Sequence, residues 1–265
     1  MKRNIFSIVI LAVLVVGPIA ARAEGTTLKV TAFLGGVYQE ETSLMSDGLR
    51  ANGLVPTREP YTALGYKFTS GEQAVADESV FEMTGKNAII DWVIVELRNP
   101  KNLQKVAYSA SALLKANGNV VSADGVKPLE IPIKRGYYHV VLKHRNHLAV
   151  MTASPMNIGQ RVDLHRVPLF GTEASMVIGG IQTLWPGDAN FDGVVNYVGE
   201  GNDREEILED IGEAIPTNVV SGYFGSDINM NGEVKYVGAG NDRDIVLQTI
   251  GGATPEAVRK AQLPE

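Results

Sequence analysis

Two segments of the chain place oxygen-bearing side chains at every second position and then a glycine. The first is Asp188-Ala-Asn-Phe-Asp-Gly193, and the second, 39 residues later, is Asp227-Ile-Asn-Met-Asn-Gly232. Oxygen donors at positions 1, 3 and 5 of a loop, with a sharply turning glycine at position 6, are typical of a loop that wraps calcium. Because the two segments align without a gap, we expect a pair of related calcium loops.

The same pattern assigns the remaining ligands. Position 7 contributes a backbone carbonyl, position 9 a side chain or a water, and position 12 a bidentate acid. Glycine stands at position 12 in both copies, and a four-residue insertion delays the acid. The predicted ligands are, in the first site, Asp188, Asn190, Asp192, the carbonyl of Val194, Asn196 and Asp203, and, in the second, Asp227, Asn229, Asn231, the carbonyl of Glu233 and Asp242.

The two predicted sites differ in charge. Asn231 stands where the first loop has Asp192, and Lys235 stands where it has Asn196. The second site therefore has one carboxylate fewer and a nearby ammonium, so we expect it to bind calcium more weakly. Calcium fits better than magnesium or zinc because the ligands are all oxygen. The competing interpretation is a pair of Asx-rich turns that cap helices without an ion.

Each loop leads into a predicted short helix, at residues 203–211 and 242–250. Apolar residues recur on one face of each helix, and a glycine follows each end. The two helices can bury these faces against each other. The sequence therefore predicts a small α module, EF-hand-like, over residues 187–252, followed by a tail at 253–265 with a last helical turn.

Residues 1–23 have the pattern of a signal peptide. Lys2 and Arg3 precede an apolar run, and Ala21-Arg-Ala23 supplies a cleavage signature. The alternative is an uncleaved membrane anchor, for which the run is short, and no later segment is apolar enough to span a membrane. We expect a protein that is secreted or held at the cell surface.

The charge and the cysteine content restrict the kind of partner that the chain can bind and the way in which its C-terminal segment can fold. The net charge is −6, and residues 185–265 carry 15 Asp and Glu against 5 Lys and Arg. An acidic segment argues against a nucleic-acid partner and suits cation binding. The chain has no cysteine, so a C-terminal segment of this size is marginal on burial alone, and bound cations should contribute to its folding.

The segment from 24 to 180 has the pattern of an antiparallel β-sandwich. Short β-branched and aromatic runs alternate with turn residues. A brief linker is expected at 181–186. Strands are predicted at residues 27–34, 88–97, 106–116 and 129–134, with a hairpin formed by 137–144 and 148–153.

The duplicated loops resemble the type I dockerin module, whose units have the form D-x-N-x-D-G-x-V-N, as in residues 188–196. The resemblance implies two calcium sites and a cohesin partner. The four-residue insertion departs from that pattern, and so do Tyr197-Val198 and Tyr236-Val237, which replace the Ser/Thr-type pair that dockerins present to cohesin. Segments 44–50, 59–65, 87–98 and 144–148 resemble a domain of large secreted Gram-negative bacterial surface proteins.

Other residues that could do chemistry are weaker candidates. His139, His144 and His147 cluster around one hairpin but lack ligand spacing for zinc, and Asp91 and Glu96 lie on opposite faces of a strand. Aromatics such as Trp92 fit core packing better than a sugar surface. The leading hypothesis is a non-catalytic, calcium-stabilised protein of surface assembly or adhesion. The alternatives are a subunit that docks on a cohesin-like scaffold and a protein that binds or hydrolyses carbohydrate.

Overall fold

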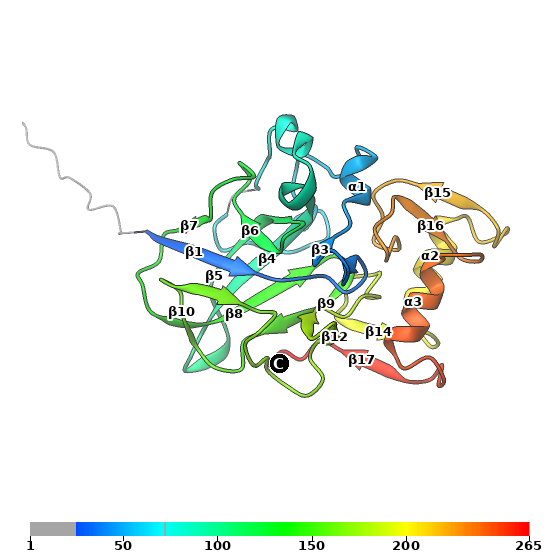
Figure 1. Ribbon diagram of the computed structural model, residues 1–265. Coiled ribbons are helices and arrows are strands. Elements are labelled where there is room, and N and C mark those ends of the chain that lie inside the picture. Colours follow the sequence, from blue (N-terminus) through cyan, green and yellow to red (C-terminus); the bar gives the residue numbers. More distant parts are fainter. Residues whose placement is uncertain (1–24, 72, 265) are drawn as a thin grey trace, which may run out of the picture.

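The computed structural model describes residues 25–71 and 73–264. The predicted signal peptide, residues 1–23, lies outside this range. Two parts are visible in Figure 1: a sheet body, residues 25–184, and a smaller C-terminal unit, residues 185–264, at one end of the sheet. None of the helices in the described ranges is long and apolar enough to cross a membrane.

The sheet body is built around a long antiparallel hairpin. Its strands β4 (Ile89–Asn99) and β5 (Asn102–Lys115) lie inside a nine-stranded sheet. Seven of the strands follow the order β10-β8-β4-β5-β6-β1-β11, and outside this order β7 pairs with β1 and β9 pairs with β8. All pairings in this sheet are antiparallel except that of β1 with β11. The prediction of a mainly β, antiparallel fold is confirmed. The other strands are β1 (Thr26–Thr31), β6 (Asn119–Val121), β7 (Leu129–Ile131), β8 (Tyr137–His144), β9 (His147–Met151), β10 (Met156–Asn157) and β11 (Arg161–Asp163).

Strand β4 is covered on both faces. Ten of its eleven residues are buried, as expected for a β-branched run in the middle of a sheet. The segment between β1 and β4 supplies part of the cover, and it contains β2 (Tyr38–Gln39), β3 (Leu44–Met45), the helix α1 (Gly48–Ala51) and two 3-10 turns, Glu78–Glu82 and Gly85–Asn87. Trp92 is fully buried and its indole N–H donates to the carbonyl of Pro56 at 2.8 Å, so the core role expected for Trp92 is confirmed.

The predicted linker, residues 181–186, is paired rather than free. β13 (Ile181–Thr183) forms a hairpin with β12 (Met176–Ile178), and Leu184 then bridges Leu34. Gly179 and Gly180 make the turn with positive φ angles of 57° and 81°, which a two-residue hairpin turn requires. The predicted boundary between residues 180 and 181 therefore falls inside a hairpin.

The C-terminal unit contains two similar halves. Each has a loop with a short strand, a helix and a second strand: β14 (Val194–Asn196), α2 (Asp203–Asp210) and β15 (Val219–Ser221), then β16 (Glu233–Lys235), α3 (Asp242–Thr249) and β17 (Val258–Lys260). The helices begin at the predicted residues and pack against each other. Val195, Ile207, Val234 and Val246 are buried in a cluster that also includes Leu148 of the sheet body.

The halves exchange strands. β15 of the first half pairs with β16 in the second loop, and β17 of the second half pairs with β14 in the first loop. The prediction of a helical turn and a loose tail at 253–265 was wrong, because this segment contains β17. Val219 and Val258 begin the two exchanged strands at the same 39-residue spacing as the loops, so the repeat extends as far as β17.

Candidate metal centre

The delayed acid of the first loop returns to the loop. One carboxylate oxygen of Asp203 accepts the backbone N–H of Ala189 at 2.7 Å, and the other accepts that of Asn196 at 2.9 Å. These amides belong to positions 2 and 9. Asp203 is completely buried and, as the first residue of α2, lies at the positive end of the helix. The insertion thus leaves the acid facing the loop interior.

The insertion closes on itself as a small turn. The Asn190 amide donates to the carbonyl of Gly201 at 3.0 Å, and the Asn202 amide donates to that of Gly199 at 2.6 Å. Gly199 and Gly201 have φ angles of 102° and 65°, and residues that carry a Cβ rarely adopt such angles. The Asn202 side chain also accepts the N–H of Glu205 at 3.1 Å and so caps α2.

The first positions of the loop are held by its own side chains. Both Asp188 oxygens accept the N–H of Gly193, at 3.3 and 3.1 Å. Asn190 accepts from the N–H of Asp192 at 3.0 Å, and Asp192 accepts from that of Val194 at 2.7 Å. Together with Asn196, all predicted ligand residues of the first site therefore lie in one closed loop, residues 188–203, called loop one below.

Loop two, residues 227–242, repeats this arrangement. Asp242 accepts the N–H groups of Ile228 and Lys235 at 2.9 Å each, and Asp227 accepts that of Gly232 at 2.8 Å. Position 4 is left-handed in both loops, with φ 61° at Phe191 and 53° at Met230. Asn229 accepts from the N–H of Asn231, and Asn231 from that of Glu233, as in loop one.

The carboxylates of loop one repel one another. Burial and the charge of Asp203 raise the pKa of Asp188 well above its usual value. Burial raises the pKa of Asp203 to about 7, although the N–H groups of Asn196 and Ala189 oppose the shift, and Asp192 adds to it. Among the described residues, no Lys, Arg or His forms an ion pair with these three acids. Asp188 and Asp203 are buried, and buried carboxylates of this kind either take up a proton or pair with a cation.

Loop two is less strongly charged, and a buried arginine lies close by. Burial raises the pKa of Asp227 to about 6, while the N–H of Gly232 and the charge of Arg145 lower it. Burial and Asp227 raise the pKa of Asp242 to about 7, against the N–H of Lys235. The Lys235 ammonium forms an ion pair with Glu233 at 2.5 Å. The sequence identified Lys235 as the cation near this loop, but it gave no sign of Arg145.

The donor set fits a hard cation that accepts amide and carbonyl oxygens. The described residues contain no group of three or more His, Cys, Asp or Glu side chains arranged to hold a metal, so the acids alone do not make a site. However, the Asn196 side-chain oxygen is buried and makes no hydrogen bond in the described part of the chain. This oxygen is the predicted ligand at position 9. Calcium takes such mixed oxygen sets.

The turn between β8 and β9 docks the C-terminal unit on the sheet body through Tyr223 and Phe224, which precede loop two. The Arg145 guanidinium donates to the carbonyl of Phe224 and, at 2.8 Å, to Asp91. Tyr223 also donates to Asp91, at 2.6 Å. Burial alone would raise the pKa of Asp91, but Arg145 and the other donors lower it to about 2. A charged, fully buried carboxylate thus links the two parts.

The remaining candidates from the sequence also have structural partners. Nε2 of His144 donates to the charged Asp91 at 3.2 Å, the His144 ring stacks edge-on against His147, and His139 contacts the carbonyl of Thr152 at 2.7 Å. All three histidines are buried. Glu96 pairs with Arg98 at 2.9 Å and Lys143 at 2.8 Å, so Asp91 and Glu96 have separate partners.

The comparisons with known proteins give no family. No protein-family model matches the chain, and no curated protein matches it significantly. Two solved chains are weakly similar, both from type II cohesin–X–dockerin complexes of Acetivibrio cellulolyticus. The N-terminal interface mutant is 20% identical over 59% of this chain and 79% of that chain, with a TM-score of 0.30. The C-terminal interface mutant is 18% identical over 85% and 95%, with a TM-score of 0.34. Similarity at this level carries no argument about function.

Proposed function

We propose that the protein is a non-catalytic, exported calcium-binding protein whose C-terminal unit is folded and docked with the help of two ions. The observation that carries the proposal is the pair Asp188 and Asp203. Both are buried in one loop, their pKa values are raised, and neither has a cationic partner in the described residues. A divalent cation would supply the missing charge.

Each loop would hold one ion through its own residues. Asp188, Asn190, Asp192, Asn196 and Asp203, with the Val194 carbonyl, would serve the first. Asp227, Asn229, Asn231 and Asp242, with the Glu233 carbonyl, would serve the second. The units form a dockerin-like pair in which exchanged strands replace part of the helix packing. We assign the sheet body as a sandwich that carries this pair.

Calcium would stabilise the folded protein by mass action. Extracellular calcium modules bind with dissociation constants of roughly 10⁻⁴–10⁻³ M. Calcium at about 100 times the dissociation constant adds about 2.7 kcal/mol per site to the free energy of unfolding. For two short halves joined by three-residue strands, a contribution of this size decides whether the C-terminal unit stays folded.

The test is thermal melting of the mature protein with calcium and with a chelator. We expect a higher melting temperature in calcium, and the double variant Asp188→Asn/Asp203→Asn should lose most of that difference. Glu209→Gln, which removes an exposed acid from α2 outside the loop, should keep it. Equal melting curves of the wild type in calcium and in chelator would refute the proposal.

A docking function for the C-terminal unit is a second candidate. In both halves an arginine of the helix lies over the tyrosine at position 10 of the loop, Arg204 over Tyr197 at 5.1 Å and Arg243 over Tyr236 at 5.0 Å. The adjoining Val198 is 37% exposed. This twofold-repeated aromatic and apolar pair would suit a protein partner. A calcium-dependent complex with a cohesin-like domain, lost in Tyr197→Ala/Tyr236→Ala, would support this function.

A further inference from the structure

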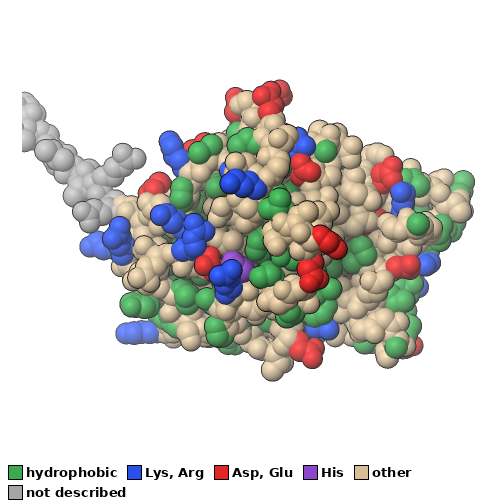
Figure 2. Space-filling view, viewed as in Figure 1, with side chains coloured by type: hydrophobic (Ala, Val, Ile, Leu, Met, Phe, Trp, Pro, Cys, Tyr) green, Lys and Arg blue, Asp and Glu red, His purple; other side chains and the backbone are tan. Residues whose placement is uncertain are grey.

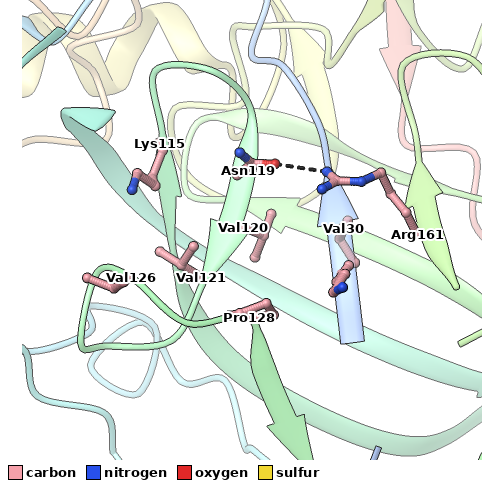
Figure 3. Close-up of a pocket in the computed structure, with 9 residues that line it drawn as sticks. Val30, Lys115, Asn119, Val120, Val121, Val126, Pro128 and Arg161 are labelled. Atoms are coloured by element: carbon pink, nitrogen blue, oxygen red, sulfur yellow. Dashed lines mark hydrogen bonds between the residues drawn. The ribbon is translucent and has the colours of Figure 1, made fainter. Parts of the chain in front are cut away.

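A small hollow on the sheet body is lined by three basic side chains and no acidic one. It has a volume of about 150 Å³, and its lining includes Lys29, Lys115 and Arg161 (Figure 3). Asn119 and a rim of Val126 and Pro128 complete it. The hollow lies on the neighbouring strands β5, β6, β1 and β11. Figure 1 shows β1, β5 and β6 on the side of the sheet body away from the C-terminal unit. Figure 2 shows Lys and Arg side chains gathered on this side.

Strand register explains why the cations meet. Lys29 of β1 lies beside Arg161 of β11, while Val30 lies between Val120 and Val162. Val30, Val120 and Val162 are buried in the core. Since successive side chains point to opposite faces, Lys29 and Arg161 point away from that core. The same register places Lys115 and Asn119 on the sheet face that carries Lys29 and Arg161.

These cations have no anionic partner in the described residues. Lys115 as a whole residue is only 7% exposed, and its ammonium donates to the carbonyl of Gly125 at 3.3 Å. Arg161 donates to the neutral oxygens of Thr31 at 2.9 Å and Asn119 at 3.0 Å. Burial lowers the pKa of Lys115, as expected for a buried ammonium without a counter-charge.

The acidic residues of neighbouring strands do not act as counter-charges for Lys29, Lys115 and Arg161. Asp163 follows Arg161 on β11, and Glu130 of β7 accepts a hydrogen bond from Thr27 at 2.6 Å. Neither lines the hollow or forms an ion pair with its three cations. The rim is held in place because Asp124 accepts the N–H groups of Val126 and Lys127 at 2.9 Å each.

We propose that this basic hollow binds one sulfate or phosphate group. Guanidinium and ammonium donors suit tetrahedral oxyanions, and the charge of the ligand would offset the three cations. Pockets for drug-sized ligands have volumes of roughly 300–1,000 Å³, so a hollow of about 150 Å³ accepts the oxyanion group and little else. The group can be a free ion or the ester of a larger molecule whose remainder stays outside Val126, which is 67% exposed.

The test is titration of the mature protein with inorganic sulfate and phosphate, followed by calorimetry and by NMR shifts of the Arg161 side chain. We expect one ion per chain. Lys115→Met and Arg161→Gln should each weaken binding about tenfold or more, whereas Lys105→Gln, at an exposed position of β5, should not change it. No binding at millimolar anion, or equal binding by all variants, would overturn the proposal.

Separate controls test whether each variant folds and whether the bound anion is a free ion or part of a larger molecule. Lys115→Met keeps the side-chain length and removes a buried charge, and a melt of each sample verifies folding. Arg161 is exposed, so its variant keeps the test valid if the Lys115 variant unfolds. Glucosamine 6-sulfate that binds more tightly than inorganic sulfate would identify a sulfated glycan as the source, and equal affinity would identify the free ion. Unsulfated glucosamine that binds equally well would refute an oxyanion site.

Discussion

The side-chain amide of Asn146 donates a hydrogen bond of 2.7 Å to the backbone carbonyl of Asp227, and both residues are buried. Asn146 belongs to the turn between β8 and β9, and Asp227 is position 1 of loop two. The sheet body therefore holds the first ligand residue of the second predicted calcium site. Gly36 and Gly48 approach the same loop closely, since a Cβ on either would lie within 2.8 Å of the carbonyls of Ile228 and Met230.

Replacement of Asn146 by Ala should loosen loop two. The change leaves the buried carbonyl of Asp227 without its donor, which costs about 1–3 kcal/mol of unfolding free energy. Because the loop is then less ordered, the weaker of two calcium-binding steps should weaken further, while the stronger stays the same. Chemical denaturation and calorimetry measure the two effects. Asn102→Ala, at the exposed first residue of β5, should leave both calcium-binding steps unchanged. A loss of the stronger step in Asn146→Ala would contradict the assignment.

Substitution of Asp203 by Asn tests whether the delayed acid serves the ion. Asn retains one oxygen that can accept a backbone N–H but removes the charge and the bidentate carboxylate. The free energy of unfolding in chelator should change little, because the lost hydrogen bond is offset by less repulsion from Asp188. In calcium, the stabilisation from the first site, about 2.7 kcal/mol at 100 times the dissociation constant, should disappear. Unchanged calcium affinity in this variant would show that the insertion removes Asp203 from the site.

The loops and helices could be predicted because their signals are local. Ligand spacing, the capping residues Asn202 and Asn241, and the glycines of the insertion all act within a few residues of one another. The arrangement of Asp203 was accessible to the same reasoning, since an insertion that closes as a turn leaves its ends unchanged.

The contacts that join distant segments could not be predicted from these signals. β14 and β17 have three residues each, too few for a periodic pattern, and their pairing joins positions about sixty residues apart in the chain. The repeat of Pro216 and Val219 at Pro255 and Val258 was the available signal for the exchanged strands. Nothing near Arg145 or Asn146 in the sequence indicates that their turn contacts loop two.

The second site should gain affinity when its missing charge is restored. Asn231→Asp gives loop two the carboxylate that Asp192 supplies in loop one, at a position whose side chain already accepts the N–H of Glu233 at 2.8 Å. We expect two unequal binding steps in the wild type and a smaller difference between them in Asn231→Asp. Calorimetry measures both steps. Two equal steps in the wild type would contradict the predicted asymmetry.

The buried histidines should contribute less stability as the pH drops below about 6.5. Burial lowers the pKa of His144, with Asp91 opposing, and burial together with the charges of His144 and Arg145 lowers that of His147 well below its usual value. The unfolded chain takes up these protons at an ordinary pKa of about 6.5, whereas the folded protein does not. The stabilising contribution is therefore complete above pH 6.5 and is lost as the pH falls through the window below it.

His147→Gln isolates this contribution from the loop carboxylates, which are common to both proteins. Between about pH 7 and 5, the unfolding free energy of the wild type should fall more steeply than that of the variant, by up to about 1.4 kcal/mol per pH unit. Asp91 acts in a separate range, because its pKa of about 2 preserves its contribution until the pH falls below about 4. Denaturant melts at constant calcium measure both slopes. Parallel curves for the two proteins between pH 7 and 5 would contradict the prediction, because they would show that folding does not lower the pKa of His147. The lowered pKa agrees with the contact in which Nε2 of His147 accepts the N–H of Gly36 at 3.1 Å.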